Sequence, residues 1–234
     1  MNQTKIALVT GASSGIGRAV SEALLQEGYE VYGIGRNFPD DTAPGVHRLA
    51  YDLRDVAGLP AYLKAGLPGK LSLLANCAGV AFFGPHETLS PAEIHEMVTV
   101  NTEVPILLSG LFLRDLKETG GAILNISSIT AKQSDNTHGC AYGATKAALT
   151  NFSLSLFAEI RKSGVRVITI HPDLTDTALY RNADFRPAED PDCVLSPEEV
   201  AEAALFALKV REGMAVNDIT LRPQRNRIVR KTDA

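Results

Sequence analysis

Residues 5–17 read KIALVTGASSGIG, and this stretch decides the fold of the chain. Its first part, Lys5–Thr10, is apolar and rich in β-branched side chains, which predicts a buried strand. Residues 18–26 then follow a helical pattern, which Gly28 ends. A strand, a glycine-rich turn and the start of a helix, in this order, form a dinucleotide-binding unit.

The turn between this strand and this helix suits a phosphate group. Its glycines let the backbone turn tightly and approach a pyrophosphate, and the N–H groups and dipole of the helix start attract negative charge. A glycine-rich turn can also occur without a ligand, but the strand before it and the helix after it favour nucleotide binding. The residues expected to contact the nucleotide here are Gly11, Ser13, Ser14, Gly15, Ile16 and Gly17.

Strands and helices alternate along the rest of the chain. The expected strands cover residues 5–10, 30–35, 46–51, 71–77, 121–128, 165–171 and 217–221. Helices fill the gaps, and two of them are expected to begin with capping boxes at Ser90 and Ser196. Repeated βα units predict a parallel sheet of about seven strands with helices on both faces. We therefore expect one doubly wound, Rossmann-type α/β domain that spans residues 1–234.

Composition narrows the classes of function. The chain of 234 residues has a net charge of -4, which gives no reason to expect nucleic acid or an anionic membrane as a partner. The three cysteines form no even framework, so a reduced, cytoplasmic setting is expected. No signal peptide and no transmembrane helix are expected. The five histidines lack the paired spacing of a metal site, so no metal is expected.

Tyr142 and Lys146 stand four residues apart, and in a helix this spacing places both side chains on one face. A free tyrosine has a pKa of about 10 and is a poor acid–base group at neutral pH. A nearby cation favours the phenolate, so we expect Lys146 to lower the pKa of Tyr142. The pair could then pass a proton to or from a substrate oxygen, although this spacing also occurs by chance in many helices.

Taken together, these features resemble the short-chain dehydrogenase/reductase family over about residues 5–221. Five motifs occur in the family's order, which is far more specific than any one of them. The matching positions are Thr10, Gly11, Gly15 and Gly17 of the glycine motif, Asn76-Cys77-Ala78-Gly79 of the Asn-Asn-Ala-Gly motif, and Asn101, Ser128, Tyr142 and Lys146 of the catalytic set.

The resemblance implies roles for the catalytic set. Tyr142 would exchange a proton with the substrate oxygen, and Ser128 would hydrogen-bond and orient that oxygen. Lys146 would also bind the nicotinamide ribose. Asn101 is expected to hold a water that links Lys146 to solvent; capping or bending its own helix is the structural alternative, and the two roles can coexist.

The second strand bears on the choice of cofactor. Gly35 stands where an acidic residue usually holds the ribose hydroxyls of NAD, and Arg36 follows it. Arg36 could bind a 2′-phosphate through two charge-assisted hydrogen bonds, so NADP is expected; alternatively, Arg36 stacks on adenine or faces water. By resemblance, the remaining cofactor contacts are expected from Asp52, Leu53, Asn76, Ala78, Gly79, Pro172, Thr175 and Thr177, together with Tyr142 and Lys146. Asp52 could equally be a plain strand-end residue.

Two segments stand apart from the βα repeats. Residues 173–195 are expected to form a mobile substrate lid, with Asp173 where the family often has glycine and with Leu179, Tyr180 and Phe185 as pocket residues. Residues 222–234 form a basic tail, which is expected to be solvated or to contact another subunit. The family commonly forms tetramers through long helices, so a homo-oligomer, either a dimer or a tetramer, is expected. Leu149, Phe152 and Leu156 could form its interface or belong to the core.

The predicted function is NADP(H)-dependent reduction of a carbonyl, either an aldehyde or ketone or a 3-oxoacyl group, to an alcohol, or the reverse reaction. Two alternatives stay open: a non-catalytic NADP-binding sensor or regulator, and an NAD-dependent alcohol dehydrogenase. The sequence does not select among a 3-oxoacyl thioester, a small aldehyde or ketone, a pteridine and a sugar, because substrate choice depends on the lid.

Overall fold

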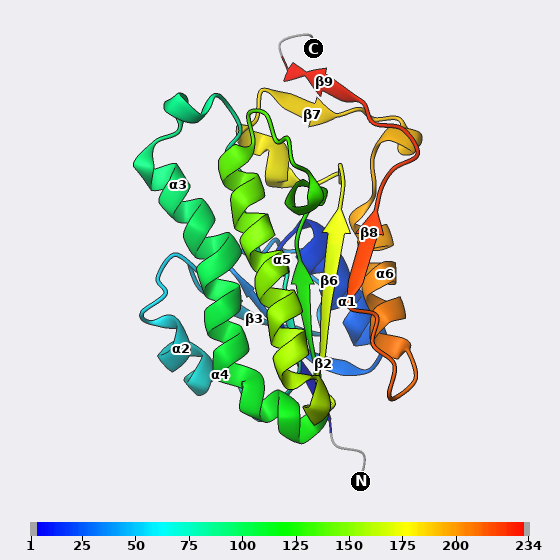
Figure 1. The fold of residues 1–234 in the computed structure, drawn as a ribbon. Coiled ribbons are helices and arrows are strands. Elements are labelled where there is room, and N and C mark those ends of the chain that lie inside the picture. The colour runs from blue at the N-terminus through cyan, green and yellow to red at the C-terminus, as the bar shows by residue number, and fades with distance from the viewer. Residues whose placement is uncertain (1–3, 232–234) are drawn as a thin grey trace.

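Seven parallel strands form the central sheet of the computed structural model, which describes residues 4–231 (Figure 1). The strands are β1 (Lys5–Thr10), β2 (Tyr29–Gly35), β3 (Val46–Ala50), β4 (Leu71–Asn76), β5 (Ala122–Ile126), β6 (Arg166–Pro172) and β8 (Asp218–Leu221). All seven strands predicted from the sequence are present, with small displacements at their ends. The expected fold class, a doubly wound α/β sheet, is confirmed.

The strand order β3-β2-β1-β4-β5-β6-β8 reverses direction at β1. From β1 the chain first adds strands on one side, through β2 and β3, and then crosses to β4 on the other side. Helices that follow β1 and β4 therefore leave the sheet on opposite faces, which opens a crevice beyond the carboxyl ends of these two strands. In open α/β sheets this crevice is where ligands bind.

Six α-helices cover the sheet. They are α1 (Gly15–Gln26), α2 (Leu59–Gly66), α3 (Pro91–Val98), α4 (Val104–Thr119), α5 (Cys140–Ile160) and α6 (Pro197–Lys209). Helices α1 and α6 pack together on one face, and α4 and α5 lie on the other (Figure 1). Both capping boxes are confirmed, because Ser90 and Ser196 each accept a hydrogen bond from the backbone N–H of the glutamate three residues on.

The two faces of the sheet bury two hydrophobic cores. Small side chains such as Ala7, Val9 and Ala204 fill the core beneath α1 and α6. Larger ones such as Leu8 and Leu74, both without solvent exposure, fill the core beneath α2, α4 and α5. Because successive residues of a strand point to opposite faces, a strand segment buried on both faces is apolar throughout, as residues 6–9 of β1 are.

Helices α3 and α4 join through a short π-helical segment, Thr99–Glu103, to give one long helical run. By length and composition alone, the run Pro91–Thr119 could cross a membrane, a test that the core helix of a soluble protein also passes. Half of its most apolar window is buried inside the structure. The π-helical segment is the part of this run that bears on the site, because it holds Asn101.

A second, small sheet was not predicted. Strand β7 (Phe185–Pro187), inside the expected lid, pairs antiparallel with β9 (Ile228–Arg230), inside the basic tail. In Figure 1 the two strands lie together at the end of the molecule where the sheet strands terminate. Part of the tail therefore pairs with the lid of its own chain, while most of the side chains of residues 222–231 remain exposed, as expected for a solvated tail.

Candidate active site

The glycine turn after β1 brings backbone against backbone. Gly11 has a φ of +70°, and a Cβ atom on it would lie 2.8 Å from the Cα of Ala78. A Cβ atom on Gly17 would lie 2.3 Å from the carbonyl oxygen of Gly11. Only glycine fits these two positions, because any side chain would collide with main-chain atoms that cannot move aside. Thr10 completes the junction, since its hydroxyl accepts hydrogen bonds from the N–H groups of Cys77 and Ala78, both at 3.1 Å.

This cradle fits a pyrophosphate. Helix α1 begins directly behind the turn, and the side chain of Ser14 at its N-cap does not cap it. The first N–H groups of the helix are therefore left for an anion, which the helix dipole also favours. A cavity of about 310 Å³ starts at Gly11, Ser14 and Gly15 and runs toward α5.

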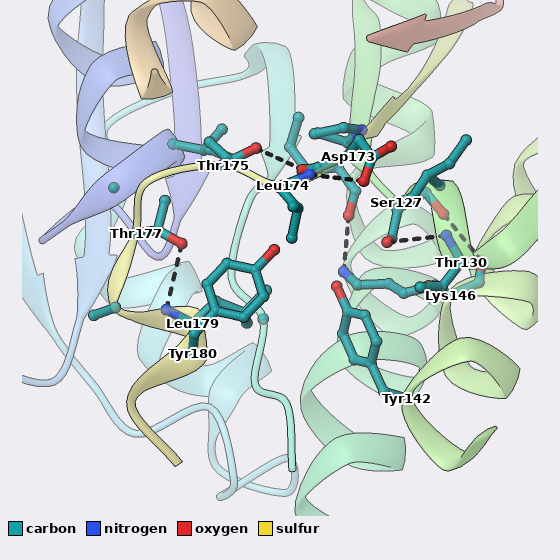
Figure 2. Close-up of a pocket in the computed structure, with 18 of the residues that line it drawn as sticks. Ser127, Thr130, Tyr142, Lys146, Asp173, Leu174, Thr175, Thr177, Leu179 and Tyr180 are labelled. Carbon is teal, nitrogen blue, oxygen red and sulfur yellow. Dashed lines mark hydrogen bonds between the residues drawn. The ribbon is translucent and has the colours of Figure 1, made fainter. Parts of the chain in front are cut away.

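The catalytic candidates meet at the far part of this cavity. Ser128 follows β5, while Tyr142 and Lys146 lie on adjacent turns of α5, and all three line the cavity. The Nζ atom of Lys146 donates a hydrogen bond to the carbonyl oxygen of Ile126 at 2.9 Å and lies 5.9 Å from the centroid of the Tyr142 ring. Figure 2 shows the Tyr142 hydroxyl and the Lys146 ammonium pointing toward the same space.

The two adjacent serines, Ser127 and Ser128, differ in their hydrogen-bond partners. The Ser127 hydroxyl lies 3.1 Å from the carbonyl oxygen of Lys146 and 2.8 Å from the hydroxyl of Thr150, so it ties β5 to α5. The Ser128 hydroxyl instead accepts a hydrogen bond from the N–H of Thr130 at 3.2 Å and acts to lower the pKa of Tyr142. Ser128 is therefore the serine that can act together with the tyrosine.

Burial dominates the acid–base properties of the pair. It raises the pKa of Tyr142 to about 12, although the hydrogen bond with Ser128 acts in the opposite direction. Burial likewise lowers the pKa of Lys146 to about 8. Cys77 provides no counter-charge at pH 7, because burial raises the pKa of its thiol to about 12. Burial therefore moves the pKa of Tyr142 in the direction opposite to the one expected from Lys146, because removal from water disfavours the charged phenolate.

Asn101 is fully buried, and its side chain links three parts of the structure. Its amide nitrogen donates to the carbonyl oxygen of Val80 at 2.8 Å and to the hydroxyl of Thr145 at 3.1 Å. Its amide oxygen accepts a hydrogen bond from the N–H of Val80 at 2.9 Å. The amide therefore holds the loop after β4 and the start of α5 to the π-helical segment. The water-holding role stays a prediction.

Asn76 points away from the cavities. It is 2% exposed, and its amide nitrogen donates to the amide oxygen of Asn125 at 2.8 Å. Asn125 in turn donates to the hydroxyl of Ser153 at 2.8 Å, so a buried polar chain connects β4, β5 and α5. Its neighbours Ala78 and Gly79 do line both cavities at the glycine turn. A contact of Asn76 with cofactor therefore stays a prediction.

A second cavity, of about 130 Å³, lies on the other side of the glycine turn and is lined by Ser13, Arg36, Asp52, Leu53 and Arg54, among others. Hydrogen bonds from Arg54 hold the pKa of Asp52 below its usual range, and the charge of Arg36 acts in the same direction. The Arg54 guanidinium binds both carboxylate oxygens of Asp52, at 2.5 and 3.0 Å. Within residues 4–231 no carboxylate forms an ion pair with Arg36, so its charge remains available.

Comparisons with known proteins identify the family. A family model described as short chain dehydrogenase matches residues 5–186. The chain belongs to the short-chain dehydrogenase family. An uncharacterised oxidoreductase of Staphylococcus aureus strain MRSA252 is 32% identical over 230 residues, covering 94% of this chain and 97% of the relative. An uncharacterised oxidoreductase of Staphylococcus epidermidis is 29% identical over 228 residues, with the same coverage of both chains.

Several solved structures of similar fold are complexes with nicotinamide cofactors. An alcohol dehydrogenase from the archaeon Thermococcus sibiricus, complexed with 5-hydroxy-NADP, has a TM-score of 0.84 and 27% identity and covers 96% of this chain and 99% of its own. The 3-ketoacyl-(acyl-carrier-protein) reductase from Brucella melitensis, complexed with NADH, has a TM-score of 0.80 and 25% identity and covers 93% of this chain and 96% of its own. This chain is thus an oxidoreductase of the short-chain dehydrogenase family with a nucleotide-binding Rossmann fold.

The lid of this short-chain dehydrogenase begins at the part of the large cavity next to the glycine turn. Pro172, Thr175 and Thr177 all line that cavity, and their contact with a cofactor stays a prediction. A Cβ atom on Gly15 would lie 3.1 Å from the Cγ2 of Thr177, so Thr177 rests on the glycine turn. The hydroxyl of Thr177 accepts a hydrogen bond from the N–H of Leu179 at 3.3 Å and caps the next short helix (Figure 2).

Several cavity residues of this short-chain dehydrogenase were missed in the sequence, among them Phe83, Arg181 and Asn226. Phe83 and Asn226 line the large cavity, and Arg181 lines both cavities. Each is an isolated residue outside any motif, and no spacing in the sequence marks it. The arginines of the lid were visible in the sequence as charged residues, but only the fold shows that Arg181, and not the others, lines both cavities. No cluster of metal-ligating side chains is found among residues 4–231.

Proposed function

We propose that this protein is an NADP(H)-dependent reductase that converts an aldehyde or ketone to an alcohol, or catalyses the reverse reaction. One observation carries the proposal: Ser128, Tyr142 and Lys146 line a cavity that begins at the glycine turn. A cofactor that lies across this turn and a carbonyl compound beside Tyr142 would then share one site. The cofactor and substrate positions of this site are built on the same sheet and helices, which supports a single catalytic domain over residues 1–234.

The residues of the chain have distinct parts in the reaction. When bound, the nicotinamide supplies a hydride, and so two electrons, to the carbonyl carbon. Tyr142, whose pKa burial raises to about 12, keeps its proton at pH 7 and donates it to the carbonyl oxygen. Ser128 orients this oxygen by a hydrogen bond. Lys146 places a cation near the oxygen of Tyr142 after the proton has left, and solvent returns the proton.

Cofactor binding divides into three regions. The glycine turn and the start of α1 would hold the pyrophosphate, and the cavity at Asp52 and Leu53 would hold the adenosine. Arg36 lines that second cavity, so its guanidinium would hold a 2′-phosphate and make NADP the preferred cofactor. The proposed substrate is a small molecule, and neither nucleic acid nor a membrane is a proposed partner.

Arg36→Ala is expected to raise the Kd of NADPH about 10- to 100-fold and to leave that of NADH nearly unchanged, because charge-assisted hydrogen bonds to the 2′-phosphate are lost. Cofactor fluorescence measures both constants. Arg48→Ala is the matched control, since Arg48 is an exposed arginine on the neighbouring strand β3. Tighter binding of NADH than NADPH by the unmutated protein would reject the preference for NADP.

Arg181→Ala is expected to raise the Kd of NADPH and that of NADH alike, by about tenfold. The reason is that Arg181 lines both cavities at the glycine turn, where a pyrophosphate would pass. The same fluorescence titration measures this effect. Arg186→Ala, in the same lid, is the control, because Arg186 pairs with Glu189 instead. A loss confined to NADPH would place Arg181 at the 2′-phosphate, and no loss would remove it from the cofactor site.

Assembly and location follow as further proposals. Leu149 and Leu156 are buried in the core, whereas Val98, Ile106, Leu111 and Leu154 expose between 40% and 47% of their surface on α3, α4 and α5. This set of apolar side chains supports a homo-oligomer, dimeric or tetrameric, formed through the long helices. Cys77, Cys140 and Cys193 are all free, which supports a reducing, cytoplasmic location.

A further inference from the structure

The wall of the large cavity beyond Tyr142 is aromatic. Phe83, from the loop after β4, Tyr180, from the lid, and Phe185, on β7, meet there, and we call these three rings the aromatic slot. The centroid of Phe83 lies 6.0 Å from that of Tyr180, with nearly parallel rings at 19°, and 5.3 Å from that of Phe185, edge to face. Tyr180 and Phe185 are 5.5 Å apart. Phe83 also lies 5.6 Å from the ring of Tyr142, so the slot adjoins the proton donor.

The three rings pack against one another and form one wall of the cavity, against which a ligand ring can lie. Phe83, Tyr180 and Phe185 are each only partly buried, so each keeps ring surface that faces the cavity. In Figure 2 the Tyr180 ring stands across the cavity from Tyr142, and both hydroxyls point into the space between them. A ligand ring placed there could make the offset or edge-to-face contacts that aromatic side chains prefer.

Two cations and one carboxylate line the cavity, and neither cation is reserved for an anionic substrate. The charged side chains that line it among the described residues are Lys146, Asp173 and Arg181. Lys146 is engaged with Ile126, and Arg181 also lines the adenosine cavity. Asp173 adds a carboxylate at the start of the lid. A carboxylate or phosphate on the substrate would therefore meet an acidic side chain, without a cation reserved for it.

We propose that the substrate is a neutral aldehyde or ketone whose carbonyl carbon bears an aromatic ring, and that this ring occupies the aromatic slot while Tyr142 bonds to the oxygen. This assignment rests on the proposed reductase function and narrows its substrate class. It disfavours a 3-oxoacyl thioester, which has a long, flexible and charged carrier, and a sugar, which would bring many hydroxyl groups to a mostly apolar wall.

The C-terminal tail holds two of the three slot rings. Strand β9 pairs with β7, which carries Phe185. The Nζ atom of Lys231 donates to the carbonyl oxygens of Tyr180 at 2.8 Å and of Arg181 at 3.1 Å. Asn226 of the tail also lines the cavity. The tail therefore fixes the slot, and it belongs to the determinants of specificity.

Matched aldehydes test the proposal. With NADPH, kcat/KM for benzaldehyde is expected to exceed that for cyclohexanecarbaldehyde and that for 4-carboxybenzaldehyde about tenfold each. The first comparison removes the flatness and π-character of the ring and also its conjugation with the carbonyl. Conjugation makes benzaldehyde the less electrophilic aldehyde, so a preference for it would reflect contacts of the ring. The second comparison adds a charge. Equal values for benzaldehyde and cyclohexanecarbaldehyde, or a preference for a 3-oxoacyl thioester, would overturn the aromatic slot and leave the reductase function standing.

Slot variants separate binding of the ring from catalysis. Phe83→Leu and Phe185→Leu are each expected to lower kcat/KM for benzaldehyde roughly 3- to 10-fold, with no change for acetaldehyde and an unchanged Kd for NADPH. Phe206→Leu is the matched control, because Phe206 is 61% exposed on α6. An equal loss with both aldehydes would overturn the slot as a specificity site. Absence of turnover with every carbonyl compound, despite tight NADPH binding, would overturn the proposed reductase function as well.

Discussion

Tyr142→Phe is expected to lower kcat for carbonyl reduction about 10²- to 10⁴-fold, while the Kd of NADPH stays nearly constant. The variant keeps the ring, which packs beside Phe83, and removes only the hydroxyl that would supply the proton. Steady-state kinetics with an aldehyde and a cofactor titration give the two quantities. A melting temperature close to that of the unmutated protein would show that the fold survives.

Tyr180→Phe is the control for this experiment. Tyr180 brings a second hydroxyl to the same cavity, and burial raises its pKa above the ordinary value, as it does for Tyr142. Because Tyr180 lies on the lid, away from Lys146 on α5, its hydroxyl is not expected to supply the proton. Comparable losses of kcat in the two variants would contradict the role given to Tyr142. Full activity in Tyr142→Phe would remove the tyrosine from the mechanism.

Lys146→Met is expected to abolish activity. It is also expected to show by how much the buried ammonium lowers the free energy of unfolding. Lys146 is 3% exposed, and burial lowers its pKa to about 8, well below the value of about 10.4 for an unfolded lysine. Below pH 8 Lys146 carries its proton in both the folded and the unfolded protein. The buried charge therefore lowers the free energy of unfolding by its full amount in this range. Between about pH 8 and pH 10.4 the folded protein loses the proton first, and stability rises with pH relative to the variant.

The expected gain over this range is about 3 kcal/mol in the unfolding free energy of the unmutated protein relative to Lys146→Met. Chemical denaturation of the cofactor-free proteins from pH 7 to pH 10.5 measures it. Taking the difference between the two proteins cancels the titration of shared groups. The bond from Lys146 to Ile126 weakens when the ammonium loses its proton, so its loss in the variant belongs to the same pH-dependent difference. A difference that does not vary with pH would show that the ammonium is solvated or paired in the folded protein.

Much of the fold could be predicted because local sequence and tertiary structure agree. Strands β1, β4, β5 and β6 of the main sheet are largely buried and mostly apolar, so their pattern was clear in the sequence. Gly11 and Gly17 were recognisable because backbone contact with Ala78 and Gly11 leaves room for no other residue. Ser128, Tyr142 and Lys146 could be brought together from the sequence because each has a fixed position at a strand end or on one helix face.

Other features depend on contacts between distant segments. Strands β7 and β9 are each three residues long, too short for a periodic signal, and Phe185 pairs with Arg230 far along the chain. The tail is rich in arginine, a composition that is typical of a solvated segment. The contact of Lys231 with the lid exists only in the folded chain, so the composition does not indicate it. The four-residue spacing of Tyr142 and Lys146 predicted their proximity but not their burial, and burial sets the direction of both pKa shifts.

The pairing of β7 with β9 has a consequence for how specificity can be exchanged between relatives. A foreign lid grafted into this chain would lack its own partner strand, and a foreign tail would meet a lid that it does not match. Because the two segments are separated by helix α6 and strand β8, a chimera with one crossover between lid and tail would split the pair. Lid and tail should therefore be exchanged together. Chimeras that take both segments from one parent protein should keep the substrate selectivity of that parent.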